Sequence, residues 1–136
     1  MIVVEFTIEG PPVSHQTHDK AKLAAWRDLV RAAAAKAMGS ASPSAEPLKI
    51  TVAYYHDAPA VLIDNDNMVK PIQDALNLLV YLDDRQITHA DVRKGDINGR
   101  FIVRGVSSIL LAGFAAGKAF LYVKAETEPD PAHLPR

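Results

Sequence analysis

The hydrophobic positions of this chain follow two kinds of pattern, strand-like alternation and helical spacing. Residues 2–8 (Ile-Val-Val-Glu-Phe-Thr-Ile) are β-branched and partly alternating, which predicts a strand. The same reasoning predicts further strands at residues 48–55, 86–93, 101–106 and 119–125. Asn98-Gly99 lies between the strands predicted at 86–93 and 101–106, and it predicts the turn of a β-hairpin there.

A long helix is predicted at residues 20–38, with Asp19 as its N-cap and Gly39 as its end. Its apolar residues are spaced by three and four, and the stripe they form consists of Leu23, Trp26, Val30, Ala33 and Ala37. The rest of its surface is basic, and the residues concerned are Lys20, Lys22, Arg27 and Arg31. Two interpretations stay open, a solvated face and a basic strip near a phosphate backbone.

A second helix is predicted within the most acidic part of the chain. Pro71 lacks an N–H group and is tolerated near the start of a helix, so we expect the helix to begin between Asn67 and Lys70. Its expected buried residues are Met68, Ile72, Ala75, Leu76 and Leu79. A short helix is expected at residues 109–115, ending at Gly117.

Together these elements predict an α+β (mixed α/β) fold. We expect one small domain spanning residues 1–136, with a mixed sheet of four to five strands packed against two main helices. Residues 126–136 are expected to form a flexible tail.

Composition excludes several classes of site. The chain has 136 residues and no cysteine, so disulfides, thiolate metal sites and cysteine nucleophiles are excluded. Its 15 basic and 16 acidic residues give a net charge of −1, so there is no overall basic footprint for nucleic acid. Because no apolar run approaches the ~20 residues of a membrane span, and Met1 leads into a strand pattern rather than a signal peptide, we expect a cytoplasmic protein without membrane association.

Acidic residues are concentrated around the second helix. Asp64 and Asp66 lie two residues apart, Lys70 follows four residues later, and the pair Asp83-Asp84 comes after a further apolar run. Carboxylates held close together repel one another, and a hard divalent cation relieves that repulsion. A nearby lysine can offset the charge that grows on a phosphate during its transfer. This set of side chains therefore suits Mg²⁺ or Mn²⁺ and phosphoryl transfer.

Other interpretations of this segment were weighed. A solvated helix face with an Asp66–Lys70 pair is the default for a charge run, but it does not explain the acids beside apolar runs. An EF-hand calcium loop fails, because the positions needing an oxygen ligand, glycine and glutamate hold Met68, Val69 and Ala75. Residues 113–118 lack the spacing of a phosphate-binding loop and indicate a helix stop. Residue types alone leave the solvated face and the metal site both open.

The order of these residues resembles the RusA family of Holliday junction resolvases. The resemblance covers roughly residues 1 to 94, and it is carried by Gly10-x-Pro12, Asp64-x-Asp66-Asn67-x-x-Lys70, Asp74-Ala75-Leu76, Tyr81-x-Asp83-Asp84-x-Gln86-Ile87 and Lys94. It implies a homodimeric endodeoxyribonuclease that uses Mg²⁺ or Mn²⁺ to promote attack of water on phosphodiesters of branched DNA.

The resemblance also implies roles for individual residues. Asp64, Asp66 and Asp84 would bind the metal, Lys70 would be the catalytic lysine, and Asp83 would be a structural neighbour. The residues expected to contact DNA are His15, His18, Lys20, Lys22 and Lys94. A zinc site at the two histidines is disfavoured, because no second His or Cys pair follows at a suitable spacing.

One departure from the family concerns DNA binding. RusA carries an arginine-rich stretch before the first aspartate, whereas residues 58–63 here are Ala-Pro-Ala-Val-Leu-Ile. Two alternative functions therefore stand beside junction cleavage. One is a DNA-structure-binding protein of the same fold that does not cut, and the other is a nuclease for other branched or flapped DNA.

Overall fold

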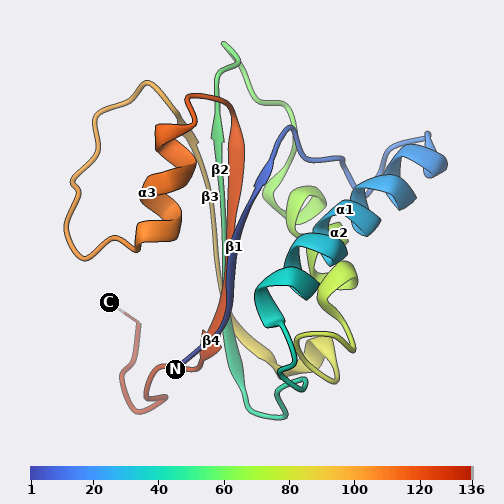
Figure 1. Cartoon of the computed structure of the whole chain (residues 1–136), viewed down its shortest axis with the longest axis vertical. Helices are drawn as coiled ribbons and strands as arrows, with labels where there is room; N and C mark the ends of the chain where they lie inside the picture. The colour runs from blue at the N-terminus through green and yellow to red at the C-terminus, as the bar shows by residue number, and fades with distance from the viewer. Residues whose placement is uncertain (136) are drawn as a thin grey trace.

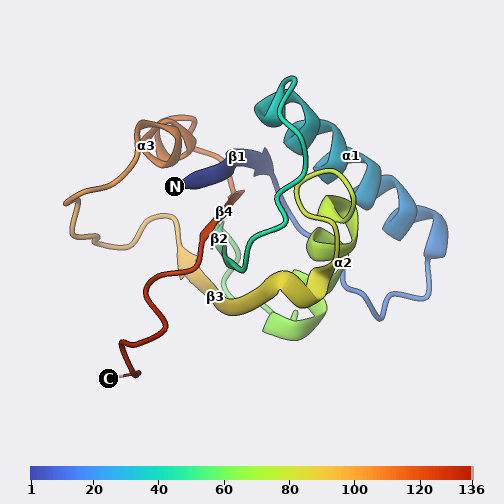
Figure 2. The ribbon, with the colours of Figure 1, turned by 90° about the horizontal axis from the view of Figure 1, so that it is seen from below.

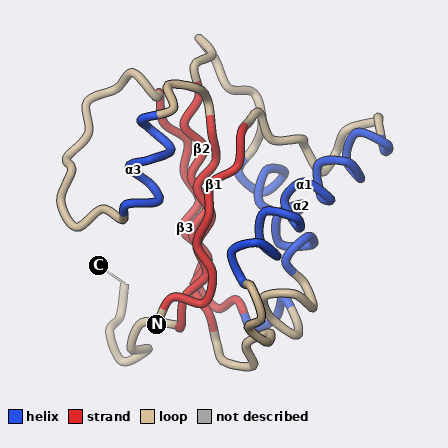
Figure 3. Tube along the Cα trace, viewed as in Figure 1, coloured by secondary structure: helices blue, strands red, loops and turns tan. Residues whose placement is uncertain are grey.

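The computed structural model describes residues 1–135. A four-stranded mixed sheet forms its middle layer, with helices on both faces (Figures 1 and 3). The elements in chain order are β1 (Ile2–Glu9), α1 (Lys20–Met38), β2 (Leu48–His56), α2 (Asn65–Leu76), the 3₁₀ helix η1 (Asp84–Gln86), β3 (Ile87–Asp96), α3 (Ser108–Ala115) and β4 (Phe120–Thr127). The strand order is β1-β4-β2-β3, in which β2 and β3 are parallel and the other pairs are antiparallel. The predicted α+β class is confirmed.

The two faces of the sheet are covered differently. Helices α1 and α2 cover one face, while α3 and the loop of residues 97–107 lie on the other (Figure 2). The main core lies on the α1/α2 side, and its fully buried side chains include Val30, Leu48, Ile50, Met68, Ile72, Leu76, Leu121 and Val123. Within residues 1–135, no helix has both the length and the apolar character needed to cross a bilayer.

Helix α1 has the predicted bounds but not quite the predicted stripe. The Asp19 side chain accepts a hydrogen bond from the N–H of Lys22 (3.0 Å), and Gly39 takes a positive φ of 58° at the other end. In its second half the buried residues are Ala34 and Met38, not the predicted Ala33 and Ala37. Two steps of four residues exceed the ~7.2 residues of two helical turns, so the buried face turns around the helix axis between Val30 and Met38.

The strand predicted at residues 101–106 does not form. Residues 97–107 are a loop, and β3 pairs only with β2, so Asn98-Gly99 makes a turn that leads to no second strand. Phe101 instead packs against Tyr55 and Phe114, with ring centroids 5.7 and 5.2 Å apart, respectively. These aromatic contacts hold the loop over the face of the sheet rather than along its edge.

Helix α2 begins earlier than predicted, at Asn65, and it holds Pro71 in its interior. Pro71 has no N–H to donate to the carbonyl of Asn67, one turn earlier. The backbone N–H of His15 donates to that carbonyl instead, at 2.9 Å. The loop after β1 thus supplies the hydrogen bond that the proline removes, which is why the helix continues through it. The helix ends at Leu76, so Leu79 lies beyond it and is only partly buried.

The tail begins later than predicted. Strand β4 continues to Thr127, and the N–H of Glu128 then donates to the carbonyl of Pro47 at 3.0 Å. Residue 136 lies outside the described residues.

Arg31 was predicted to lie on a basic face of α1, but its guanidinium reaches the end of α2. It donates to the carbonyls of Ala75 and Asn77, both at 3.0 Å. A cation hydrogen-bonded to the last carbonyls of a helix stabilises that helix end. Arg31 therefore joins the two helices through a charge-assisted contact.

We predict that Arg31→Ala lowers the free energy of unfolding by about 1–2 kcal/mol, because two charge-assisted hydrogen bonds are lost at the end of α2. Urea denaturation followed by circular dichroism measures the change. Arg27→Ala is the matched control, since no hydrogen bond of the Arg27 side chain is present within residues 1–135. Equal destabilisation by the two variants would show that the contact with α2 contributes nothing.

Candidate active site

The first turn of α2 carries the two leading aspartates on its surface. Asp64 is the N-cap residue, but its side chain makes no capping hydrogen bond. Asp66 lies in the first turn, and both residues are exposed. Acidic residues at a helix N-terminus are favoured by the helix dipole, which accounts for their place without any ligand. Because Asp64 does not cap the helix, its carboxylate remains free for other partners.

This first turn is anchored from three sides. The Lys94 ammonium of β3 donates to the carbonyl of Ile63 at 2.8 Å, next to Asp64. The Asn65 amide donates to the carbonyl of Val92, also on β3, at 3.4 Å. The third contact is the bond from the His15 N–H described above. Two residues predicted to contact DNA, His15 and Lys94, therefore lie beside the acidic segment.

Lys70 links α2 to the second acidic pair. Its ammonium lies 2.8 Å from Oδ1 of Asp74 and 3.7 Å from Oδ2 of Asp84. The hydrogen bond to Asp74 raises the pKa of Lys70, and the charges of Asp74 and Asp84 add to the effect. Lys70 is therefore held in its charged form. It pairs with Asp74 in the next turn, not with Asp66 as the solvated-face interpretation assumed.

Asp83 and Asp84 are adjacent in sequence but have different partners. Asp83 caps η1, accepting hydrogen bonds from the backbone and the guanidinium of Arg85. These bonds hold the pKa of the Asp83 carboxyl well below its usual range. Gln86 completes the cap, because its side-chain oxygen accepts from the N–H groups of Leu82 and Asp83 at 2.9 Å. The carboxylate of Asp83 is thus engaged within its own turn, while that of Asp84 lies beside Lys70.

Tyr81 fixes this turn to α2, a role that the sequence did not reveal. Its side chain is fully buried, and its hydroxyl donates to the carbonyl of Gln73 at 2.6 Å. Burial raises the pKa of Tyr81 well above its usual range, and the nearby Asp84 and Asp74 raise it further. The sequence held one signal for this contact, a tyrosine at the end of an apolar run and close to the acidic pair. A phenol buried there needs a hydrogen-bond partner, and Tyr81 finds it in the Gln73 carbonyl.

The structure brings together some of the predicted residues and not others. Lys70 and Asp84 meet, and Asp74 joins them. Within residues 1–135, no three His, Asp or Glu side chains lie close enough together to hold a metal ion, so Asp64, Asp66 and Asp84 do not form a closed ligand set as their side chains lie. His18, Lys20 and Lys22 are exposed near the start of α1, and their side chains have no hydrogen bond or ion pair to the acidic segment in this part of the chain.

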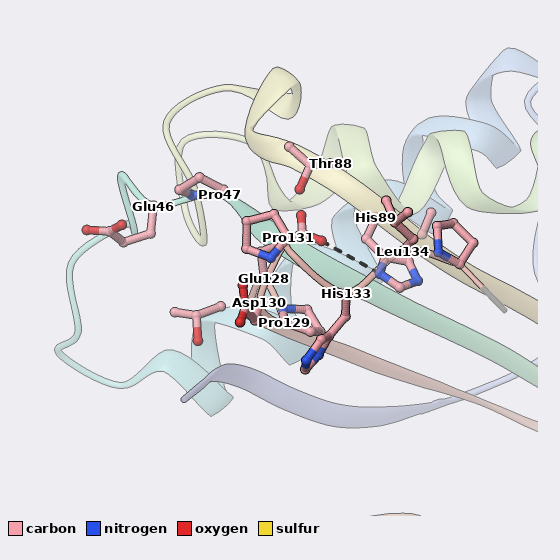
Figure 4. Close-up of a pocket in the computed structure, with 13 residues that line it drawn as sticks. Glu46, Pro47, Thr88, His89, Glu128, Pro129, Asp130, Pro131, His133 and Leu134 are labelled. Carbon is pink, nitrogen blue, oxygen red and sulfur yellow. Dashed lines mark ion pairs between the residues drawn. The ribbon is translucent and has the colours of Figure 1, made fainter.

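A cavity lies elsewhere, between the start of β3 and the residues that follow β4 (Figure 4). It has a volume of ≈ 1080 Å³, and Nδ1 of His89 lies 3.7 Å from Oε1 of Glu128 in its lining. None of the acidic residues of α2 and η1 lines it. We therefore place the candidate chemistry on the open surface around Lys70, where the carboxylates and the ammonium meet, and not in this cavity.

Two comparisons with known proteins bear on this surface. A family model described as Endodeoxyribonuclease RusA matches residues 8–104, which is more than half of the chain. The matched range contains Asp64, Asp66, Lys70 and Asp84, and it ends in the loop before α3. A search of curated proteins found no match.

We predict that Tyr81→Phe lowers the free energy of unfolding at neutral pH by about 1–2 kcal/mol, because the carbonyl of Gln73 loses a buried partner. The variant should also change the alkaline response. Above the ordinary tyrosine pKa of about 10, the unfolded chain loses the phenol proton while folded Tyr81 keeps it, so stability falls as pH rises, by up to about 1.4 kcal/mol per pH unit.

Urea denaturation of both proteins from pH 8 to 11 measures this effect. Other tyrosines have raised pKa values too, so both proteins should lose stability with pH, and the variant should lose less. Parallel curves would show that Tyr81 does not contribute to the alkaline loss.

Proposed function

This chain belongs to the RusA family of endodeoxyribonucleases, and on that premise we propose that it is a metal-dependent nuclease that cuts four-way (Holliday) DNA junctions as a homodimer. The observation that carries the proposal is the family match over residues 8–104, which includes every residue to which the resemblance gives a catalytic role. The contact between Lys70 and Asp84 supports it, because the two are 14 positions apart in sequence and α2 and η1 bring them together.

We propose Asp64, Asp66 and Asp84 as the residues that hold Mg²⁺ or Mn²⁺. Their oxygens are of the type that hard divalent ions prefer. Asp64 and Asp66 have no ion pair within residues 1–135, so both carboxylates are available. Asp84 lies beside Lys70, with Oδ2 3.7 Å from the ammonium. When bound, the ion would supply an activated water and charge neutralisation for phosphodiester hydrolysis.

Lys70 is proposed to stabilise the charge that develops on the scissile phosphate. Its ammonium is held by Asp74, which leaves further N–H donors on the same nitrogen. A fixed cation beside the reacting phosphate stabilises the transition state more than the ground state, so its effect appears mainly in the rate of cleavage. Lys94 and the His15 loop hold the first turn of α2 and thereby position the aspartates.

A homodimer fits the substrate. A junction with two-fold symmetry presents two equivalent strands, and a two-fold protein presents one site to each. Because the net charge is −1, we propose that DNA is held by local contacts from His15, His18, Lys20, Lys22 and Lys94 rather than by a large basic surface.

We predict that the wild-type protein nicks a synthetic mobile four-way junction in Mg²⁺ or Mn²⁺, that EDTA abolishes the reaction, and that Asp66→Asn slows cleavage by at least about 100-fold. Quantified denaturing gels measure the rate, and circular dichroism checks that the variant remains folded. Asp28→Asn, an exposed change on α1, is the control and should cleave as wild type does. If wild type cleaves nothing with either metal, the nuclease proposal fails.

Lys70→Gln is predicted to slow cleavage by about 100-fold while junction affinity changes only a few-fold, because the lysine acts on the transition state. Single-turnover cleavage and gel-shift titration separate the two quantities. Lys36→Gln, on α1, should leave both unchanged. A loss of affinity as large as the loss of rate would assign Lys70 to DNA binding instead.

The second candidate is a DNA-structure-binding protein that does not cut. The observation that favours it is the open arrangement of the aspartates, with no three-residue metal-binding group within residues 1–135. Binding of a junction without metal and without nicking would favour this candidate. A panel of forked, flapped and four-way DNAs identifies the preferred substrate if cleavage occurs.

A further inference from the structure

Lys70 lies between two carboxylates, and its contacts with them are unequal. Its Nζ atom is 2.8 Å from Oδ1 of Asp74, which is the distance of a charge-assisted hydrogen bond. Oδ2 of Asp84 is 3.7 Å away, so the second contact is between charges and is not a hydrogen bond. A shift of the ammonium by roughly 1 Å would bring it within hydrogen-bonding distance of Asp84. The structure thus directs the ammonium to Asp74 and leaves Asp84 without a hydrogen bond from it.

Different elements position the two carboxylates. Asp74 follows Lys70 by four residues on α2, and this spacing places two side chains next to each other on a helix. Asp84 comes from η1, whose turn is fixed to α2 where Tyr81 donates to the carbonyl of Gln73. Helix α2 therefore carries both the partner of Lys70 and the attachment of the turn that bears Asp84. The two distances from Lys70 are set by this shared backbone.

The Asp74 carboxylate has one polar partner. Within residues 1–135, its side chain has no hydrogen bond or ion pair except those with Lys70. This side chain is 31% exposed, less than the 48% of Asp84, so water competes less for it. An i,i+4 ion pair on a helix surface adds little to stability, so the main effect of the pair is on the position of the lysine.

We propose that Asp74 is the positioning residue of Lys70. By holding the ammonium, it prevents a hydrogen bond between Lys70 and Asp84, and the Asp84 carboxylate stays available to a divalent cation. An ammonium bonded to that carboxylate would compete with the cation for the same oxygens and repel it. Asp74 is not a metal ligand in this proposal and acts through Lys70. The inference rests on the proposed function, which assigns Asp84 to the metal, and it adds a residue that controls metal affinity.

The test is a double-mutant cycle on Mn²⁺ binding by the full chain, measured from the electron paramagnetic resonance signal of free Mn²⁺. Asp74→Asn should raise the Mn²⁺ dissociation constant by about 10-fold, as changes to residues around metal ligands do. In a Lys70→Gln background no ammonium can bond Asp84. There the same substitution should raise the dissociation constant by no more than about 3-fold, through the lost charge alone.

Two further variants serve as controls, and circular dichroism checks that each variant is folded. Asp74→Glu keeps the charge and can still reach Lys70, so it should bind Mn²⁺ within about 3-fold of wild type. Asp28→Asn removes one negative charge from the exposed surface of α1 and should leave Mn²⁺ binding unchanged.

Equal weakening of Mn²⁺ binding by Asp74→Asn in the two backgrounds would show that Asp74 acts through its charge alone, and it would overturn the inference. A wild type that binds no Mn²⁺, or an Asp74→Glu variant as weak as Asp74→Asn, would overturn it too. Nicking assays on the same proteins keep the two proposals apart. Coupling without cleavage would contradict the nuclease and leave the positioning role standing, whereas cleavage without coupling would do the reverse.

Discussion

Repulsion between carboxylates is the constraint on which the candidate site depends. Five aspartates lie between residues 64 and 84, and the structure gives three of them a partner. Asp74 and Asp84 share the ammonium of Lys70, and Asp83 is neutralised by Arg85 and by backbone N–H groups. Within the described residues, Asp64 and Asp66 have no ion pair and are stabilised by the N-terminus of α2. Of these five aspartates, the two without an ion pair within residues 1–135 are therefore both in the first turn of α2.

The site is built on fixed backbone rather than on mobile side chains. Tyr81 and Gln86 hold the turn that carries Asp84, and both do so through hydrogen bonds to main-chain groups. Pro71 has no N–H for the Asn67 carbonyl, and that carbonyl accepts the N–H of His15 in the loop after β1 instead. This hydrogen bond joins α2 to a segment that is distant in sequence. Arg31 closes the other end of the same helix. Helix α2 is therefore held at its start, middle and end, and the spacing of its charged residues is fixed with it.

Much of the fold was predictable from the sequence, because periodicity and helix caps are local signals. The long helix, its Asp19 cap and four of the five predicted strands are confirmed within a few residues. The wrong predictions concern segments whose structure depends on contacts with residues distant in sequence. Residues 101–106 have strand-forming side chains, but Phe101 packs against Tyr55 on the face of the sheet, and no strand forms. Helix α2 passes through Pro71 because His15, far away in sequence, donates the missing bond. Lys70 lies beside Asp84 and pairs with Asp74, a pairing that the sequence did not predict. The roles of Lys70 and of the metal-binding aspartates stay predictions.

The position of β4 has a consequence for the order in which the molecule assembles. Although β4 is the last strand in the sequence, it lies between β1 and β2 and is hydrogen-bonded to both. While the chain is being synthesised, β1 and β2 have no common partner until residues 120–127 leave the ribosome. The acidic segment emerges well before that, when the sheet under α2 is still incomplete. A nascent chain would therefore carry the acidic residues of α2 and η1 before the sheet beneath them is complete.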